Sequence, residues 1–223
     1  MKVQLLVNSG SKKCLLFLAG WGMDPTPFAD LPSPGVDVLL CYDYSEMNLG
    51  SLPELLTDYN EVHLTAWSMG VWVGARLFEG QSERFASSTA INGTLCPIDD
   101  KRGLDGEGYR RMLDNFSETI LTEFYDQMFN DQLELLRFCR SRPQRSPEDI
   151  HRELALLYEA YQASGPAPDI YHRKIVSGHD RIFSIRNQVR AWGREGCESM
   201  RIPHFPFYGW NGFSAPDVTC NAA

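Results

Sequence analysis

The sequence lacks long hydrophobic runs, a surplus of positive charge and any Cys-x-x-Cys pair. The longest apolar runs, such as Cys14–Ala19, are far shorter than the roughly 20 residues that cross a bilayer. Lys and Arg number 21 against 29 Asp and Glu, which gives a formal net charge of −8 and disfavours broad contact with nucleic acid or anionic lipid. The six cysteines have no paired spacing, so we expect reduced thiols in a cytoplasmic protein with no nucleic-acid or membrane partner.

The composition is that of an ordinary globular protein. The chain has 223 residues, of which 43% are hydrophobic and 22% charged. A chain of this length buries roughly 70% of its unfolded surface, which is enough for a substantial core. We therefore expect one domain, with at most a modest insertion.

Short apolar segments alternate with helical patterns in the first half of the chain and again near its end. The segments predicted as strands are Met1–Val7, Cys14–Ala19, Val36–Cys41, Val62–Ala66, Phe85–Ile91 and Lys174–Ser177. Asn8–Lys13 is rich in turn residues, so the first two strands are predicted to form a hairpin. Strands that alternate with helices predict an α/β fold with a mostly parallel sheet covered on both faces.

The middle of the chain is helical in pattern. Apolar residues recur every four positions from Met112 to Met128, and we predict a long helix over residues 108–140. Ser146–Pro147 predicts the start of a second helix that runs to about Ala163, because a hydroxyl cap and a proline at the first position suit a helix N-terminus.

These patterns divide the chain into two parts. Residues 1–97 and 169–223 are expected to form the α/β core, and residues 98–168 a helical lid insertion. The tail, Phe207–Ala223, carries several aromatic residues but no helical pattern, so we expect it to pack on the core as a loop.

A motif for nucleophilic catalysis surrounds Ser68. Ala66 and Gly70 lie two positions before and after it, between an apolar strand and a helix-like stretch. In a nucleophile elbow, the serine occupies a strained turn from strand to helix, and small neighbours allow the backbone to come close. A Ser-x-Gly tripeptide is common, and its alternative role is a helix cap, but the flanking strand and helix favour a catalytic serine.

A second turn can supply donors for an oxyanion. The segment Gly20–Gly22 leaves a buried strand through a Gly-x-Gly turn, where the N–H of Trp21 can point into the site. The N–H of Met69, next to the serine, is the second candidate. The alternative is a tight turn with a core tryptophan.

A serine hydroxyl needs a histidine to accept its proton and a carboxylate to orient that histidine. Three of the five histidines lie in positions typical of structural or solvated residues: His63, His151 and His172. His204 follows a short apolar segment, and Asp180 follows another. The order Ser68, Asp180, His204 is that of one serine-hydrolase arrangement. His179 is expected either to support the site from behind or to lie at the surface, and Asp43 is an alternative acid.

Several blocks of sequence match a known family in the right order. The blocks are Phe17–Asp24, Ala66–Trp72, Ala90–Thr94, Pro97–Asp100, Asp180–Phe183, Asn187–Gln188 and His204–Phe207. With them the chain resembles the α/β-hydrolases, and more narrowly the BioG family of pimeloyl-acyl-carrier-protein methyl ester esterases. The resemblance implies Ser68 as nucleophile, Asp180 as acid, His204 as base, and no metal or organic cofactor.

The resemblance also implies a substrate and a partner. The substrate is the methyl ester of a pimeloyl chain on acyl carrier protein, in biotin biosynthesis. We expect the substrate-binding residues to be Gly20, Gly22, Met112, Phe116, Phe124 and Met128. The more common role of such an apolar stripe is the packing core of the lid itself.

Acyl carrier proteins are acidic, so a chain of charge −8 needs a local basic surface to bind one. The candidate docking residues are Arg137, Arg140, Arg142 and Arg145. A solvated loop is the alternative. Two other functions remain open: a general carboxylesterase or thioesterase for small acyl groups, and a non-catalytic acyl-binding module in which Ser68 is a buried helix cap.

Overall fold

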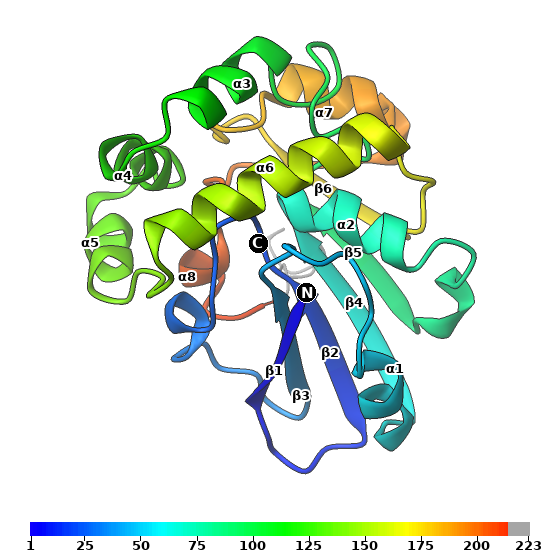
Figure 1. Cartoon of the computed structure of the whole chain (residues 1–223). Helices are drawn as coiled ribbons and strands as arrows, with labels where there is room; N and C mark the ends of the chain where they lie inside the picture. The colour runs from blue at the N-terminus through cyan, green and yellow to red at the C-terminus, as the bar shows by residue number, and fades with distance from the viewer. Residues whose placement is uncertain (214–223) are drawn as a thin grey trace, which may run out of the picture.

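In the computed structural model, residues 1–213 are described, and a seven-stranded sheet runs through them (Figure 1). The strands are β1 (Lys2–Val7), β2 (Lys13–Leu18), β3 (Asp37–Tyr42), β4 (Glu61–Trp67), β5 (Ser87–Ile91), β6 (Arg173–Ser177) and β7 (Glu198–Met200). Their order is β1-β3-β2-β4-β5-β6-β7, with β1 antiparallel to β3 and all other neighbours parallel. The predicted α/β class with a mostly parallel sheet is confirmed.

Helices cover the sheet and collect at one end of it. The α-helices are α1 (Leu52–Leu55), α2 (Met69–Leu77), α3 (Gly106–Asp114), α4 (Glu118–Gln127), α5 (Gln132–Arg140), α6 (Pro147–Ser164), α7 (Ile185–Trp192) and α8 (Phe207–Trp210). Short 3₁₀ turns are η1 (Thr26–Phe28), η2 (Leu56–Asp58), η3 (Ser82–Arg84) and η4 (Arg194–Gly196). Helices α3 to α6 come between β5 and β6 and gather around the end of the sheet where the parallel strands finish (Figure 1). Open α/β sheets place their binding sites at this end.

The predicted hairpin of the first two strands is wrong. β1 pairs with β3, from Lys2 opposite Tyr42 to Val7 opposite Val38, while β2 has parallel partners on both sides, β3 and β4. The turn-rich link lets the chain reverse direction, but it does not decide which strand becomes the neighbour. With β2 buried between two parallel strands, the edge beside β3 is where β1 pairs.

The predicted long helix over residues 108–140 is also wrong, because three helices occupy this stretch. Ser117 caps α4 by accepting a hydrogen bond from the backbone N–H of Ile120. Asp131 caps α5 in the same way through two backbone N–H groups. Both caps begin a new helix within the predicted one. The four-residue spacing of the apolar residues gives no sign of them. The predicted start of α6 is confirmed, since Ser146 accepts from the N–H of Asp149.

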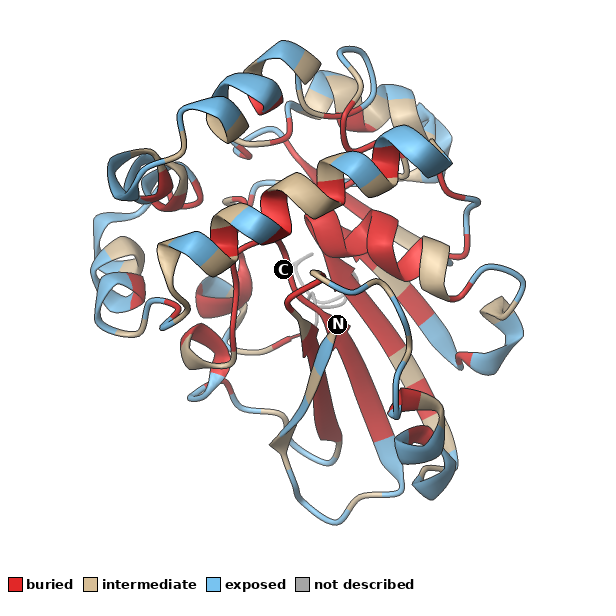
Figure 2. Cartoon of the chain, viewed as in Figure 1, coloured by how far each residue is buried: buried red, intermediate tan, exposed pale blue. Residues whose placement is uncertain are grey.

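An aromatic core fixes the chain after β7 against the centre of the sheet. Phe205 stacks on Phe28 with ring centroids 5.6 Å apart and meets Trp67 edge-on at 5.3 Å. Phe207 packs edge-on against Phe17 at 5.1 Å. Each such pair contributes about 0.5–1.5 kcal/mol beyond the burial of its area. All five rings are buried, as is much of the sheet in Figure 2, and their contacts hold the segment that begins at His204.

The end of the chain is described in part. Phe207–Trp210 forms the short helix α8, so the prediction of a loop without helix is wrong there, and residues 214–223, with Cys220, lie outside the described residues. The cysteines within residues 1–213 are free thiols. Over the same residues, no helix is both long and apolar enough to cross a membrane.

Candidate active site

Ser68 occupies a strained turn between β4 and α2. Its backbone has φ 57° and ψ −126°, a region that L-residues rarely adopt and that costs of order 1–3 kcal/mol. A Cβ at Gly70 would lie 2.5 Å from the carbonyl oxygens of Leu18 and Ala19, and one at Gly93 would lie 2.3 Å from the carbonyl oxygen of Ser68. The turn therefore exists because two glycines let neighbouring backbone come close.

The structure brings Ser68, His204 and Asp180 together in a buried row. His204 Nε2 lies 3.0 Å from Ser68 Oγ, and His204 Nδ1 lies 2.9 Å from Asp180 Oδ2. The exposed fractions of the three residues are 6%, 0% and 7%. An ionised carboxylate only accepts hydrogen bonds, so Nδ1 donates to Asp180 and Nε2 is free to accept from the hydroxyl. The arrangement can move a proton from Ser68 to His204.

Asp180 is held in place by the turn that follows β6. Its Oδ1 accepts hydrogen bonds from the backbone N–H groups of Ile182 at 2.8 Å and Phe183 at 2.9 Å. Gln188 Nε2 lies 3.4 Å from Oδ2 and also donates to the carbonyl of Phe183. One oxygen is therefore committed to the backbone, and the other is directed at His204.

The backbone of His204 is anchored from two strands. Trp67, the last residue of β4, donates its indole N–H to the His204 carbonyl at 2.7 Å. Asn92, which follows β5, donates its amide to the carbonyls of Pro203 and His204. The Phe183 ring stacks on the imidazole with centroids 6.0 Å apart. The imidazole is thus fixed by residues at the ends of three parallel strands.

These anchoring residues were not assigned a role from the sequence. Asn92 and Gln188 lie within blocks that carry the family resemblance, and each is fully buried. The available signal for Asn92 is a polar residue directly after a buried strand. For Gln188 the family resemblance is the signal, because the residue type itself gives none: a glutamine on a helix is ordinarily solvated.

The turn after β2 lies beside Ser68. A Cβ at Gly20 would be 3.1 Å from the Cβ of Ser68, so the loop passes directly over the elbow. Met69 is the first residue of α2, and the first N–H groups of a helix have no partner within it. The positions of Trp21 and Met69 are thus compatible with two donors directed at one oxygen.

Two adjoining cavities extend from Ser68 beneath the helical insertion. The inner one has a volume of about 20 Å³ and borders Ser68, Trp21 and Met69. The outer one has about 190 Å³ and reaches Gln127 and Arg181. Five residues border both cavities: Leu104, Tyr109, Met112, Phe124 and Ile182. The shared walls are apolar and suit a hydrocarbon chain.

The four apolar residues expected to bind the substrate divide into two groups. Met112 and Phe124 border the cavities. Phe116 instead stacks on His151 at 4.7 Å, and Met128 is 0% exposed within the core; neither borders these cavities. Substrate contact by these two residues stays a prediction.

Two charged residues lie in places the sequence did not indicate. Asp43, the alternative acid, forms ion pairs with Lys2 at 2.9 Å and Arg145 at 3.0 Å, while Asp180 is the carboxylate that contacts His204. The Arg145 side chain is only 7% exposed and also pairs with Glu153 at 2.6 Å. Arg145 is therefore not a surface docking residue, because two carboxylates hold it inside the protein.

His63 and His179 do not take part in this buried row. His63 lies at the far end of β4, where Nδ1 is 2.8 Å from Ser87 Oγ and Nε2 is 2.8 Å from Glu61. His179 is exposed, as expected. Over residues 1–213, no group of three His, Cys, Asp or Glu side chains is arranged to hold a metal ion.

Comparison with known proteins settles the family. A family model described as "Pimeloyl-ACP methyl esterase BioG" matches residues 1–214. The chain belongs to the BioG family. The crystal structure of BioG from Haemophilus influenzae has a TM-score of 0.84 and 31% identity, covering 96% of this chain and 98% of that one.

Other relatives place the BioG family chain in a wider context. A "Malonyl-[acyl-carrier protein] O-methyltransferase" of Bacteroides fragilis is 36% identical over 190 residues, which are 85% of this chain. The chain spans only 38% of the length of that relative. A lipase-esterase related protein from Clostridium acetobutylicum has a TM-score of 0.60 at 15% identity, covering 94% of this chain and 96% of that one. Its likeness shows the α/β-hydrolase fold alone.

Proposed function

We propose that this chain is a serine carboxylesterase that hydrolyses the methyl ester of pimeloyl-[acyl-carrier protein] methyl ester. The observation that carries the proposal is the buried row in which His204 joins Asp180 to the hydroxyl of Ser68 on a strained turn. The description of the family supports the substrate.

The reaction proceeds through an acyl-enzyme. His204 Nε2 takes the proton of Ser68 as Oγ attacks the ester carbonyl, and Asp180 stabilises the resulting imidazolium. The N–H groups of Trp21 and Met69 stabilise the negative oxygen, each donor contributing about 3–4 kcal/mol. His204 then protonates the departing methoxide to methanol. Water deprotonated by the same histidine attacks the acyl-enzyme, which releases the free carboxylate and restores Ser68.

The apolar cavities support a long-chain substrate. The ester carbonyl sits at Ser68, and the methylene chain runs between Met112 and Phe124 toward Arg181, which borders only the outer cavity. Each buried CH₂ contributes about 0.8 kcal/mol. The carrier protein then stands outside the mouth of this cavity, joined to the acyl chain through its thioester.

The exposed face around α5 supports the carrier as partner. Arg137, Arg140 and Arg142 are exposed on or just after this helix, and Leu133 and Leu136 are 76% and 44% exposed. Exposed leucines among arginines suit an acidic partner with an apolar strip. The surface therefore offers both attraction at a distance and apolar contact for docking.

Covalent labelling separates an enzyme from a binding module. A fluorophosphonate should label the chain, and labelling should vanish in Ser68→Ala and weaken in His204→Ala. Ser87→Ala is the matched control, since Ser87 also lies 2.8 Å from a histidine that contacts a glutamate. Labelling that persists in Ser68→Ala, or is absent in the parent chain, would overturn the proposal.

Product analysis separates the ester from the thioester. With the methyl ester on acyl carrier protein, we expect methanol and a carrier that keeps its acyl chain. Release of the acyl chain from the carrier would make the protein a thioesterase. Equal turnover of short soluble esters, with no preference for the carrier-bound one, would make it a general carboxylesterase.

A further inference from the structure

Three successive residues of the loop that carries Trp21 form hydrogen bonds with the helical insertion or the link before α6. The indole N–H of Trp21 donates to the Ile150 carbonyl at 2.9 Å, and the Tyr125 hydroxyl donates to the Gly22 carbonyl at 3.3 Å. Arg145 donates to the carbonyl of Met23 at 3.3 Å. These donors and acceptors come from α4, α6 and the link before α6, so the insertion sets the shape of this loop.

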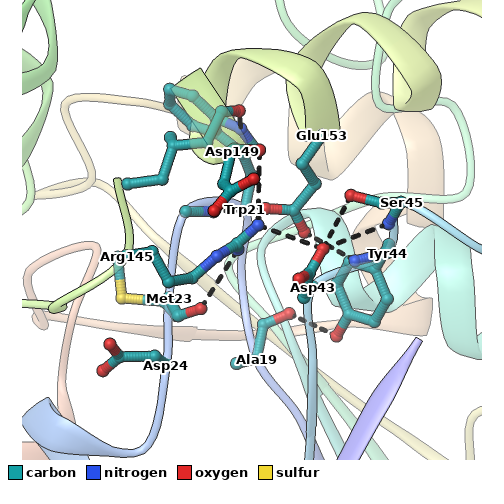
Figure 3. Close-up of polar contacts among 12 residues, drawn as sticks. Ala19, Trp21, Met23, Asp24, Asp43, Tyr44, Ser45, Arg145, Asp149 and Glu153 are labelled. Carbon is teal, nitrogen blue, oxygen red and sulfur yellow. Dashed lines mark hydrogen bonds and ion pairs between the residues drawn. The ribbon is translucent and has the colours of Figure 1, made fainter. Parts of the chain in front are cut away.

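Glu153 on α6 contacts the same loop and also the turn after β3 (Figure 3). Its Oε2 accepts from the backbone N–H of Gly22 at 3.2 Å and from Arg145 at 2.6 Å, and its Oε1 accepts from the N–H of Tyr44 at 2.8 Å. The side chain is 0% exposed. One carboxylate therefore binds the turn after β2 and the turn after β3 at once, and the first of these is next to Trp21.

The charges around Glu153 are balanced inside the protein. Arg145 lies between Glu153 and Asp43, and Lys2 contacts Asp43 from the surface. Burial raises the pKa of Glu153, while Arg145 and the N–H groups of Tyr44 and Gly22 act against this shift. Burial also acts to raise the pKa of Asp43, but Ser45, Lys2 and Arg145 outweigh it and lower the pKa to about 2.

Stability alone does not account for such a group. A buried ion pair is often no more stabilising than apolar side chains of the same volume, because desolvation offsets the attraction. Its value here is geometric, since the carboxylate fixes the two peptide N–H groups, of Gly22 and Tyr44, that donate to it. Gly22 has a φ of +75°. Glycine has more backbone freedom than any other residue, so hydrogen bonds are needed to hold its peptide groups in one position.

We propose that Glu153, held by Arg145, is a positioning residue that fixes the turn of Trp21 so that its N–H points at the developing oxyanion. The inference rests on the proposed function and assigns the lid helix α6 a part in catalysis beyond covering the substrate. Oxyanion donors act through their geometry in the transition state more than in the ground state. Loss of Glu153 should therefore lower kcat and leave KM nearly unchanged.

The test is Glu153→Gln, which keeps shape but has a single acceptor oxygen. Because two of the three donors, the Gly22 N–H and Arg145, share Oε2, the amide oxygen takes that side and the NH₂ group faces the N–H of Tyr44. The neutral oxygen also holds Arg145 and the Gly22 N–H more weakly than a carboxylate does, so the turn of Trp21 is less firmly fixed. Glu159→Gln, an exposed position on the same helix, is the matched control. We measure kcat and KM for the methyl ester per fluorophosphonate-titrated site, together with the inhibition constant of a trifluoromethyl ketone, which mimics the oxyanion.

We expect kcat of Glu153→Gln to fall at least about tenfold, the ketone to bind weaker by a similar factor, and KM to change less than about twofold. Glu159→Gln should match the parent. If Glu153→Gln does not fold, Tyr125→Phe, which removes only the contact to the Gly22 carbonyl, should give the same pattern at a few-fold size.

Two results overturn the inference and leave the proposed function intact. One is a kcat per titrated site within about twofold of the parent in a folded variant. The other is a rise in KM with no change in ketone affinity, which would assign Glu153 to substrate binding or general folding. A parent chain that neither hydrolyses the ester nor labels at Ser68 overturns the proposed function first.

Discussion

Replacing Asp180 with asparagine reverses the hydrogen bond that orients His204. Oδ1 of Asp180 accepts from the N–H groups of Ile182 and Phe183, so the amide oxygen of the variant must occupy this position. Its NH₂ group then takes the place of Oδ2, 2.9 Å from His204 Nδ1. Because an NH₂ group donates, Nδ1 becomes the acceptor and Nε2 carries the proton. His204 can then no longer accept the proton of Ser68.

The size of the effect follows from the loss of the general base. Imposing the wrong tautomer on a histidine of this kind lowers kcat about 10⁴-fold, a barrier increase of about 5.5 kcal/mol. Gln188 does not restore the tautomer, since its Nε2 contacts Oδ2 and the carbonyl of Phe183 rather than the imidazole of His204. The fold should persist, because the variant keeps the shape of the aspartate and both backbone hydrogen bonds.

Steady-state hydrolysis of the carrier-bound methyl ester measures this loss, with circular dichroism as the test of folding. Asp114→Asn, an exposed position at the end of α3, is the control and should match the parent. A folded Asp180→Asn that keeps more than about a tenth of parent kcat would refute the reasoning. If Asp43→Asn instead showed the 10⁴-fold loss, Asp43 would be the acid after all.

Three further predictions follow from the surface and from the buried contacts. Changing Arg137, Arg140 and Arg142 together to glutamate should raise KM for the carrier-bound ester and leave a short soluble ester unaffected; equal loss on both would exclude docking there. Gly70→Ala should lower the free energy of unfolding by about 3 kcal/mol and abolish labelling, because its Cβ would lie 2.5 Å from two backbone oxygens. Asp43, with its pKa lowered to about 2 from 3.8, stabilises the fold above pH 3.8, and this contribution is lost as the pH falls toward 2. Asp43→Asn should thus cost about 2 kcal/mol at pH 7 in urea unfolding, and a deficit that did not shrink between about pH 4 and pH 2 would contradict the assignment.

The site could be predicted from the sequence to the extent that its geometry is local. The strand, the small residues and the helix around Ser68 lie within a few positions of one another, so their pattern encodes the turn directly. Ser146 and Pro147 marked the start of α6 for the same reason, since a cap and a fixed φ act on the next turn of helix. His204 was found through its place after an apolar segment.

Only the tertiary structure decided which residues far apart in the chain contact one another. Both Asp43 and Asp180 follow strands that end on the same edge of the sheet, and the local sequence does not show which of them contacts His204. The strand order decides this, because β6, which precedes Asp180, lies next to β7 and the segment that follows β7. The sequence predicts Arg145 as a surface cation, but in the structure Asp43 and Glu153 enclose its side chain. Local sequence fixes turns and caps, whereas the pairing of strands and the enclosure of charges depend on packing across the whole molecule.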